Sequence, residues 1–194
     1  GEVVSDKGAV AVIDAGNALG QLSARQAVGL AVAKAKALGL GAAVVRDGFH
    51  FGTAGRYAVD ISAHGCIGIV ACNTRPLLPA PGGAEPLVGN NPIAIAMPSP
   101  DDQPPVVLDM ATSASAMGKI RLAAAAGDPI PLDWATDADG SPTTDPAAAI
   151  AGMLLPVGGA KGFGLSLMID LLCGGLSGGA TGAEVNPLYG DPAR

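Results

Sequence analysis

The first 45 residues constrain the fold most, because they predict a strand, a helix and a second strand in succession. Residues 9–14 and 42–45 are short apolar runs with the length and composition of buried strands. Residues 24–38 lie between them and repeat apolar side chains at helical spacing. Two strands joined by a helix are typically parallel, since a parallel pair needs a long crossover connection. This order predicts an α/β domain.

Residue types at both ends set the expected limits of this helix. Ser23, followed three residues later by Gln26, predicts a capping box at its start, and Gly39 predicts its end. The side chains expected to face the core are Ala27, Val28, Ala31, Val32 and Ala35. Gly39 and Gly41 follow the helix, whereas a dinucleotide fingerprint must follow a strand and open a helix. The sequence therefore argues against a Rossmann fold in this segment.

The same patterns predict the remaining elements of a single domain. Strands are expected at 67–72, 93–97 and 106–110, and helices at 53–64 and from a cap at Thr112 or Ser113 to Ala126. A last helix is expected to open within the glycine-rich stretch 155–164 and to continue to Leu176. Residues 77–92 are expected to form a long ordered loop, and residues 129–146 a solvated hairpin or Ω-loop.

Composition argues against several classes of protein. A net charge of −6 without a basic cluster disfavours a nucleic-acid surface. The three cysteines are odd in number and lack C-x-x-C spacing, so no disulfide framework or zinc site is predicted. The apolar window 163–176 is too short to cross a bilayer and contains Asp170. We therefore expect a soluble, cytoplasmic protein with reduced thiols and no metal site. Because the chain opens on the approach to a strand, we also expect a fragment lacking both termini.

His50 is the first candidate for chemistry. It follows the 42–45 strand in a loop, and Gly52 and Gly55 come next, where a helix should begin. An imidazole can give or take a proton near neutral pH, and backbone N–H groups at a helix start can bind a negatively charged ligand. The residues alone leave two interpretations. His50 is either an acid/base group facing a ligand or a histidine held by a local backbone bond.

Three further junctions carry polar or charged side chains. Asp109 lies at the junction between the 106–110 strand and the helix after it, where its carboxylate could bind ribose hydroxyls, hold a neighbouring imidazole or simply stabilise a helix start. Lys161 lies among glycines at the start of the last helix, which predicts either a phosphate or carboxylate cradle or a capped buried helix. Thr74 and Arg75 follow the 67–72 strand at its carboxyl end, where ligands of α/β proteins tend to gather.

Five motifs occur in an order that resembles one enzyme family. They are H-F-G-x-A-G-x-Y at 50–57, G-x-N-P-I-A at 89–94, L-D-M-A-T-S at 108–113, P-T-T-D-P at 142–146 and G-G-A-K-G-F-G at 158–164. Together they resemble the malate/L-lactate dehydrogenase family that does not use a Rossmann fold, which includes ureidoglycolate and sulfolactate dehydrogenases and piperideine-carboxylate reductases. The resemblance implies a mixed β-sheet with flanking helices, here a central NAD(P)-binding domain over residues 1–194.

The resemblance also implies a function, which is reversible hydride transfer between NAD or NADP and a small 2-hydroxy or 2-oxo acid. In that family the histidine of H-F-G is the acid/base, a role that falls here on His50. The implied cofactor contacts are Thr74, Asp109, Met110, Ala111, Lys161 and Gly162. Arg75 is a further candidate, for the 2′-phosphate of NADP. Family members are typically homodimers that share their active sites across the interface.

The chain departs from the family pattern just before His50, where Asp47, Gly48 and Phe49 replace the usual small polar residues. This departure leaves the partner and the tautomer of the ring open. The segments that help to hold the substrate carboxylate and complete the cofactor pocket are expected to lie outside this chain.

Two other functions are open on these residues. The departures and the missing segments suggest a non-catalytic remnant that binds only a nucleotide or a protein partner. A thiol enzyme that uses Cys66 or Cys72 with His64 is the other alternative. The apolar stretches around the cysteines disfavour it, because buried thiols are usually inert.

Overall fold

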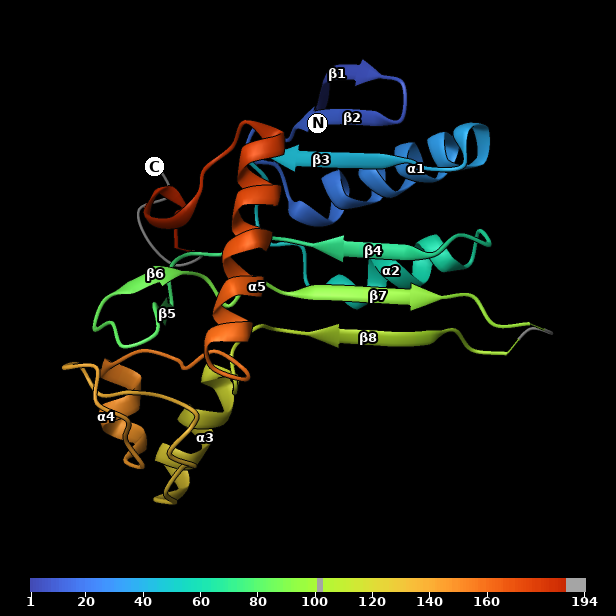
Figure 1. The fold of residues 1–194 in the computed structure, drawn as a ribbon. Coiled ribbons are helices and arrows are strands. Elements are labelled where there is room, and N and C mark those ends of the chain that lie inside the picture. The colour runs from blue at the N-terminus through green and yellow to red at the C-terminus, as the bar shows by residue number, and fades with distance from the viewer. Residues whose placement is uncertain (101–102, 188–194) are drawn as a thin grey trace.

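A computed structural model describes residues 1–100 and 103–187, and its first part confirms the predicted strand–helix–strand unit (Figure 1). Strands β1 (Glu2–Lys7), β2 (Val10–Asp14) and β3 (Ala42–Arg46) form one sheet in that order. β2 and β3 are parallel and pair along their whole length, and helix α1 (Gly20–Leu38) connects them. The sequence pattern did not predict β1, which pairs antiparallel with β2 and makes this sheet mixed.

Helix α1 begins at Gly20, so the prediction of a capping box at Ser23 was wrong. The Ser23 hydroxyl is buried and donates to the Gly20 carbonyl oxygen at 3.2 Å, while the Gln26 side chain bonds Gly1. The helix extends by a further turn because Gly20 fits against a neighbouring loop, as described below. The predicted end is confirmed, since Gly39 closes the helix with a left-handed φ of 85°.

The predicted inner face of α1 is only partly buried. Of the five side chains expected to face the core, Val32 is buried and four are half-buried: Ala27, Val28, Ala31 and Ala35. Three of these five side chains are alanines, so the helix presents a face of mostly small side chains.

A second sheet is antiparallel and contains strands β4 (Gly68–Ala71), β7 (Ile93–Met97) and β8 (Val106–Met110) in the order β4-β7-β8. Helix α2 (Ala54–Ser62) covers one face of this sheet (Figure 1). Small side chains make the contact: Ala54 and Ala58 of the helix with Ala94 and Ala96 of β7. All three strands and the helix lie where the sequence predicted them.

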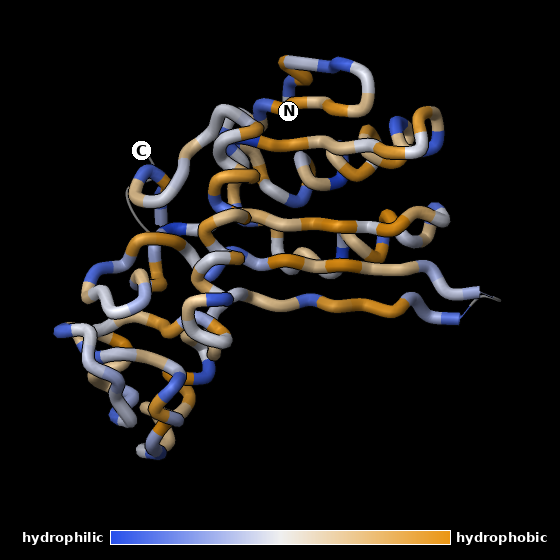
Figure 2. Tube along the Cα trace, viewed as in Figure 1, coloured by the Kyte–Doolittle hydropathy of each residue, from blue (hydrophilic) through white to orange (hydrophobic). Residues whose placement is uncertain are grey.

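The face of this sheet opposite α2 is apolar. Side chains alternate along a strand, so the face away from α2 carries Ile69, Ile95, Met97, Val106 and Leu108. All but Ile95 are exposed in the described structure, and Figure 2 shows these strands as orange bands. A contiguous apolar face of this kind is suited to contact with further protein.

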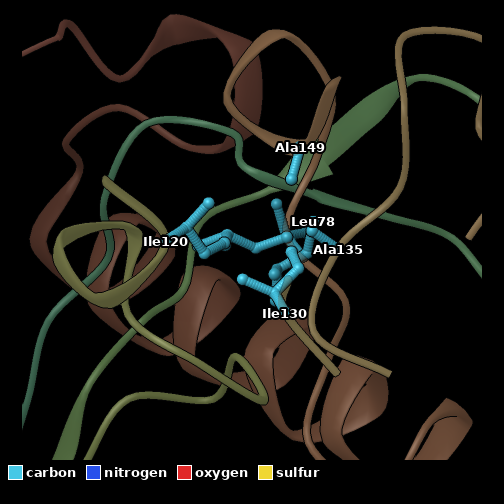
Figure 3. Close-up of a cluster of buried hydrophobic side chains, with 7 residues drawn as sticks. Leu78, Ile120, Ile130, Ala135 and Ala149 are labelled. Carbon is cyan, nitrogen blue, oxygen red and sulfur yellow. The ribbon is translucent and has the colours of Figure 1, made fainter. Parts of the chain in front are cut away.

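The remaining elements enclose the largest hydrophobic core. Strands β5 (Leu78–Pro79) and β6 (Pro86–Val88) pair antiparallel inside the predicted long loop, and helices α3 (Met117–Ala126) and α4 (Pro146–Ala151) pack beside them. The core, drawn in Figure 3, consists of Leu78, Val88, Ile120, Ile130, Ala135, Ala149 and Leu154.

The segment 129–146 forms a hairpin only around its turn. Thr136 bridges Pro142, and the Asp137 carboxylate accepts backbone N–H bonds from within the turn. Ile130 and Ala135 are buried in the core, so the prediction of a wholly solvated segment was wrong. The P-T-T-D-P motif that follows starts α4, because the Asp145 side chain accepts the Ala147 N–H at 2.9 Å.

Helix α3 begins at Met117, so the prediction of a cap at Thr112 or Ser113 was wrong. The Thr112 N–H donates to the Asn90 carbonyl oxygen at 3.1 Å, and Ser113 bridges the loop that precedes the last helix. These long-range contacts hold both residues outside the helix, which therefore begins later in the chain. Its predicted end at Gly127 is confirmed by a φ of 74°.

The last long helix runs along one end of both sheets. Helix α5 (Ala160–Asp170) continues through a π-helical turn, η1 (Leu171–Gly175), which confirms the helix predicted to open within 155–164 and to continue to Leu176. In Figure 1 it crosses the ends of β3, β4 and β8, and a short 3-10 helix, η2 (Gly182–Glu184), follows it. Across residues 1–100 and 103–187, no helix combines the length and the apolar character needed to span a bilayer.

Candidate functional site

Three strands from the two sheets end toward α5 (Figure 1). The arrows of β3, β4 and β8 point toward this helix in Figure 1, so the segments after them lie at one end of the two sheets. His50 follows β3, Thr74 follows β4, and β8 itself ends in Asp109 and Met110. Ligands of α/β proteins bind outside such carboxyl ends. This end of the sheets is therefore the candidate site.

The loop that carries His50 is tied to the turn after β2. Three backbone hydrogen bonds of 2.7–3.2 Å join them: Ala15 N–H to the Arg46 oxygen, Asn17 N–H to the Asp47 oxygen, and Phe49 N–H to the Ala18 oxygen. At the base of the loop, the Arg46 guanidinium donates to the Asp14 carboxylate at 2.9 and 3.0 Å. The Gly16 N–H and this guanidinium hold the pKa of Asp14 below its ordinary value.

Gly20, the first residue of α1, packs directly on the backbone of the same loop. A Cβ atom at Gly20 would overlap the Phe49 carbonyl oxygen and would lie 2.7 Å from the His50 carbonyl oxygen. Only a residue without a side chain allows this approach. The helix start and the His50 backbone therefore position each other.

The His50 side chain is exposed, and its ring makes no hydrogen bond with the part of the chain that the structure describes. The only other histidine of the sequence, His64, does form a local backbone hydrogen bond, since its Nδ1 pairs with the Asp60 carbonyl oxygen at 2.8 Å. The local backbone bond considered for His50 is therefore found at the other histidine. Both ring nitrogens of His50 are available to a ligand.

The residues immediately after His50 are firmly placed. The rings of Phe51 and Tyr57 stack with centroids 5.2 Å apart, and the Tyr57 hydroxyl donates to the Phe51 carbonyl oxygen at 2.6 Å. Tyr57 is buried, and burial raises the pKa of its hydroxyl, which therefore remains a donor at neutral pH. An exposed imidazole is thus carried on a fixed backbone.

Asp109 lies against the start of α2. A Cβ atom at Gly55 would lie 2.5 Å from Asp109 Oδ2, so the carboxylate packs on the first turn of that helix. Helix α3, which follows Asp109 in the sequence, begins only at Met117. A macrodipole interaction therefore involves α2 and not the following helix. His50 precedes α2 in the chain, so both side chains lie near the start of the same helix.

Asn91 is fully buried and joins three segments of the site. Its Oδ1 accepts the Thr74 N–H at 2.8 Å, and its Nδ2 donates to the Ser166 carbonyl oxygen of α5 at 2.9 Å. The Ser166 hydroxyl donates in turn to the Gly89 carbonyl oxygen at 2.7 Å. We call these four residues the Asn91 junction. It fastens the segment after β4 to the last helix.

The segment after β8 is fastened to the loop before α5. The Val157 N–H donates to the Thr112 carbonyl oxygen at 2.9 Å, and the Ala114 N–H donates to the Leu155 oxygen at 2.8 Å. The hydroxyl of Thr112 is buried and has no partner in the described part of the chain. These bonds place Ala111, which precedes Thr112, beside the loop that leads to Lys161.

Lys161 and Gly162 lie in the first turn of α5. Gly162 is buried against the Val157 carbonyl oxygen, which a Cβ atom would overlap, whereas the Lys161 side chain is exposed. Gly158 and Gly159, just before the helix, take φ values of 63° and 64° and have open space on the side where a Cβ would lie. An anion can therefore approach both the lysine and the helix start.

The sequence-predicted residues thus fall into two linked groups. Thr74, Ala111 and Lys161 belong to segments joined by the Asn91 junction and the Thr112 bond, while His50 and Asp109 lie near the start of α2. Two hollows of about 360 and 180 Å³ lie beside α3 and α4, and neither is lined by His50. The His50 side chain itself is exposed.

Sequence reasoning missed three residues that build this region. Asn91 and Ser166 form the junction, and Gly20 sets the loop that carries His50. The N-N-P run at 90–92 was a signal for the first, since polar amides inside a long apolar loop need buried partners. Nothing in the local pattern marked the other two.

The thiol alternative is not supported at Cys72. Burial raises the pKa of Cys72 to about 12 and that of Cys173 to about 11, so both thiols are protonated at neutral pH. The imidazole of His64 is turned to the Asp60 carbonyl oxygen. A protonated, buried thiol without a base is a poor nucleophile.

Comparison with known proteins gives one consistent family. Residues 1–194 match the family described as malate/L-lactate dehydrogenase. An L-sulfolactate dehydrogenase of Methanothermobacter thermautotrophicus is 45% identical over 175 residues, which is 90% of this chain and 51% of that protein. A malate/(S)-sulfolactate dehydrogenase of Methanothermus fervidus is 41% identical and covers 100% of this chain and 56% of its own length.

Solved structures agree with the described fold. The sulfolactate dehydrogenase of Methanocaldococcus jannaschii superposes with a TM-score of 0.89 at 42% identity, over 96% of this chain and 54% of that one. The delta1-piperideine-2-carboxylate reductase of Pseudomonas syringae gives 0.88 at 34% identity, over 93% and 54%. The chain spans about half the length of the curated relatives it matches.

Proposed function

Because the chain belongs to the malate/L-lactate dehydrogenase family, we propose that it carries the cofactor-binding part of an NAD(P)-dependent 2-hydroxyacid oxidoreductase. The reaction is a reversible hydride transfer between the dinucleotide and the carbon that bears the hydroxyl of a small acid. The observation that carries this proposal is the exposed ring of His50, free of hydrogen bonds to the described chain, at the sheet end where Asp109 and Lys161 also lie.

The residues at this end have the space and the donors that a dinucleotide needs. Gly158 and Gly159 leave the start of α5 open, and Lys161 adds a positive charge there. We assign the pyrophosphate to Lys161 and to the backbone of Gly162, because a helix start and a cation together bind phosphate. The buried, unpartnered Thr112 hydroxyl marks a polar spot in the same region.

We assign the ribose and amide contacts to the end of β8 and the hydroxyl contact to Thr74. The Asp109 carboxylate can accept hydrogen bonds from ribose hydroxyls, and Met110 and Ala111 offer backbone groups beside it. Thr74 is held in place by two asparagines, since its hydroxyl donates to Asn90 Oδ1 at 3.1 Å. These contacts would orient the cofactor toward His50.

His50 handles the proton in this scheme, while the bound nicotinamide supplies hydride exchange. In the oxidising direction one ring nitrogen accepts the hydroxyl proton of the substrate as the hydride leaves the carbon. In the reducing direction the protonated ring returns that proton to the oxygen. The packing of Gly20 under the loop limits how far the backbone that carries the ring can move, which favours a productive geometry.

The proposed substrates are small 2-hydroxy or 2-oxo acids. Relatives are named for sulfolactate and malate, and others for pyrroline-2-carboxylate, an imino acid. In all three classes, the carbon next to a carboxylate is bonded to an oxygen or a nitrogen, and this atom gains or loses a proton. One relative is named for NADP, so either dinucleotide is a candidate cofactor.

We also propose that the protein acts as a homodimer in the cytoplasm. The apolar face formed by Ile69, Met97, Val106 and Leu108 is a surface that a second copy would cover. The three cysteines are free, as expected in a reducing compartment. Sedimentation equilibrium checks the assembly, and a monomeric mass at micromolar concentration would contradict it.

The decisive experiment compares turnover in His50→Ala and His64→Ala. The oxidation of NADH and NADPH is followed by absorbance with a panel of 2-oxo acids. Loss of the acid/base should lower turnover by about 10²–10⁴-fold in His50→Ala, while His64→Ala should keep the wild-type rate. Equal turnover in the wild type and His50→Ala would remove His50 from the chemistry. Binding of a dinucleotide without turnover of any acid would favour the non-catalytic remnant.

A further inference from the structure

A hollow of about 180 Å³ lies next to the candidate site, between the loop after β4, the start of β6 and helices α3 and α4. Two arginines line it: Arg75 from the loop after β4 and Arg121 from α3. The rest of the lining is uncharged and largely apolar, and includes Leu77, Met117 and Met153. We call this feature the two-arginine hollow.

The two guanidinium groups have no acidic partner within residues 1–100 and 103–187. No carboxylate lines the hollow, and neither Arg75 nor Arg121 takes part in an ion pair there. Glu85 precedes Pro86 at the rim but pairs with neither of them. Two unpaired guanidinium groups in one hollow form a positive spot on a chain of net charge −6. Guanidinium groups bind phosphate through two parallel hydrogen bonds, so the spot favours a phosphate ligand.

The size of the hollow limits what it can hold. Pockets that enclose a whole drug-sized ligand occupy about 300–1,000 Å³. A volume of about 180 Å³ suits only one part of a larger ligand. The apolar lining suits the flat face of a base, and the arginines suit a phosphate attached near it.

Fixed backbone connects the hollow to the candidate cofactor residues. Thr74, the residue before Arg75, is held by the Asn91 side chain at 2.8 Å. The segment that leads into α3, and so to Arg121, is held at Thr112 by the bonds described above. Because Thr74 and Arg75 are consecutive, a ligand that contacts Thr74 lies next to the residue that lines the hollow.

We propose that the two-arginine hollow binds the 2′-phosphate of NADP, with the attached adenine against the apolar lining. This inference rests on the proposed function and adds a cofactor preference to it. NAD lacks the 2′-phosphate and cannot make these charge-assisted bonds. The chain should therefore bind NADPH about tenfold to a hundredfold more tightly than NADH.

Fluorescence titration of the full 194-residue chain with NADPH and NADH tests the inference. The variants are Arg75→Gln and Arg121→Gln, each checked for folding by circular dichroism. Each should lose about tenfold of the preference for NADPH while its Kd for NADH stays unchanged. Lys119→Gln is the matched control, because it removes a charge from α3 at a residue that lies over Trp134 instead. It should leave both dissociation constants unchanged.

The outcomes separate this inference from the proposed function. NADH binding at least as tight as NADPH binding in the wild type, or a preference that survives in both arginine variants, overturns the inference alone. Failure of both dinucleotides to bind overturns the proposed function, and the inference with it. A competition experiment tests the nucleotide assignment further. We expect 2′,5′-ADP to displace NADPH. Equal displacement by inorganic phosphate would instead show a site for free phosphate and would overturn the nucleotide assignment.

Discussion

The loop that carries His50 is exposed and is held by backbone hydrogen bonds to the turn after β2, whereas the Asn91 junction is held by two fully buried side chains, Asn91 and Ser166. The two lie at the same end of the sheets. In the first, main-chain groups bond one another, so the His50 side chain is left free. In the second, one side chain provides the partners for groups on two distant segments.

This difference separates the residue proposed for the reaction, His50, from the residues that hold the site together, the Asn91 junction. A backbone-held loop can change its exposed side chain at little cost in stability, because the bonds that shape it do not involve that side chain. A buried polar group depends on all its partners, since an unpaired group in a low-dielectric interior is costly. Changes at His50 should therefore alter activity alone, and changes at Asn91 should alter stability first.

The largest effect on stability is expected for Asn91→Ala. The substitution leaves the half-buried Thr74 N–H without its acceptor and the buried Ser166 oxygen without its donor, and it opens a small cavity. We expect the free energy of unfolding to fall by about 2–4 kcal/mol, measured by urea unfolding followed by circular dichroism. His50→Ala, in contrast, should change it by less than about 0.5 kcal/mol.

Asn90→Ala is the matched control for this experiment. Asn90 contributes one side-chain acceptor, for the Thr74 hydroxyl at 3.1 Å, so its loss should cost only about 1 kcal/mol. If Asn91→Ala cost no more than Asn90→Ala, the junction would not be the framework of the site, and the comparison would fail.

A smaller effect, on both stability and turnover, is expected for Gly20→Ala. The new Cβ would overlap the Phe49 carbonyl oxygen, so the His50 loop must move. We expect a loss of about 1–3 kcal/mol in stability, together with lower turnover. Gly29→Ala in the same helix faces open space and should instead stabilise the protein by up to about 1 kcal/mol. Thermal unfolding of both variants decides this, and the same sign in both would refute the close approach.

The smallest effect concerns pH and the ion pair at the base of the His50 loop. The pKa of Asp14 is lowered in the folded protein, so its carboxylate contributes stability above its ordinary pKa near 3.8. That contribution is lost as the pH falls through the lowered folded value. The difference in unfolding free energy between the wild type and Asp14→Asn should therefore be constant near neutral pH and shrink toward zero in acid. A difference that grew on acidification would contradict the assigned direction.

Local patterns predicted most elements, and the errors have a common cause. Strands β7 and β8 and the glycine ends of α1 and α3 follow from alternation and from left-handed glycines, which act over a few residues. The starts of both helices were misplaced, because Ser23 and Thr112 are good caps by type. Close packing at Gly20 and the bond to Asn90 from across the chain overrode that preference.

The candidate site shows the same division. The sequence pattern was enough to single out His50, Asp109 and Lys161, because imidazole, carboxylate and ammonium groups at strand or helix ends are chemically distinctive. It did not reveal that Asp109 packs on α2, or that two arginines share one hollow. Those contacts join residues that lie far apart in the chain.

By itself, the sequence determined the type and order of the elements, the ends of several of them and the family to which the chain belongs. Each of these depends on neighbouring residues or on short motifs. Only the tertiary structure decided which buried groups pair, where the helices start and which charged side chains meet. Hydrogen bonds and close packing between distant segments carry that information, and local periodicity does not record them.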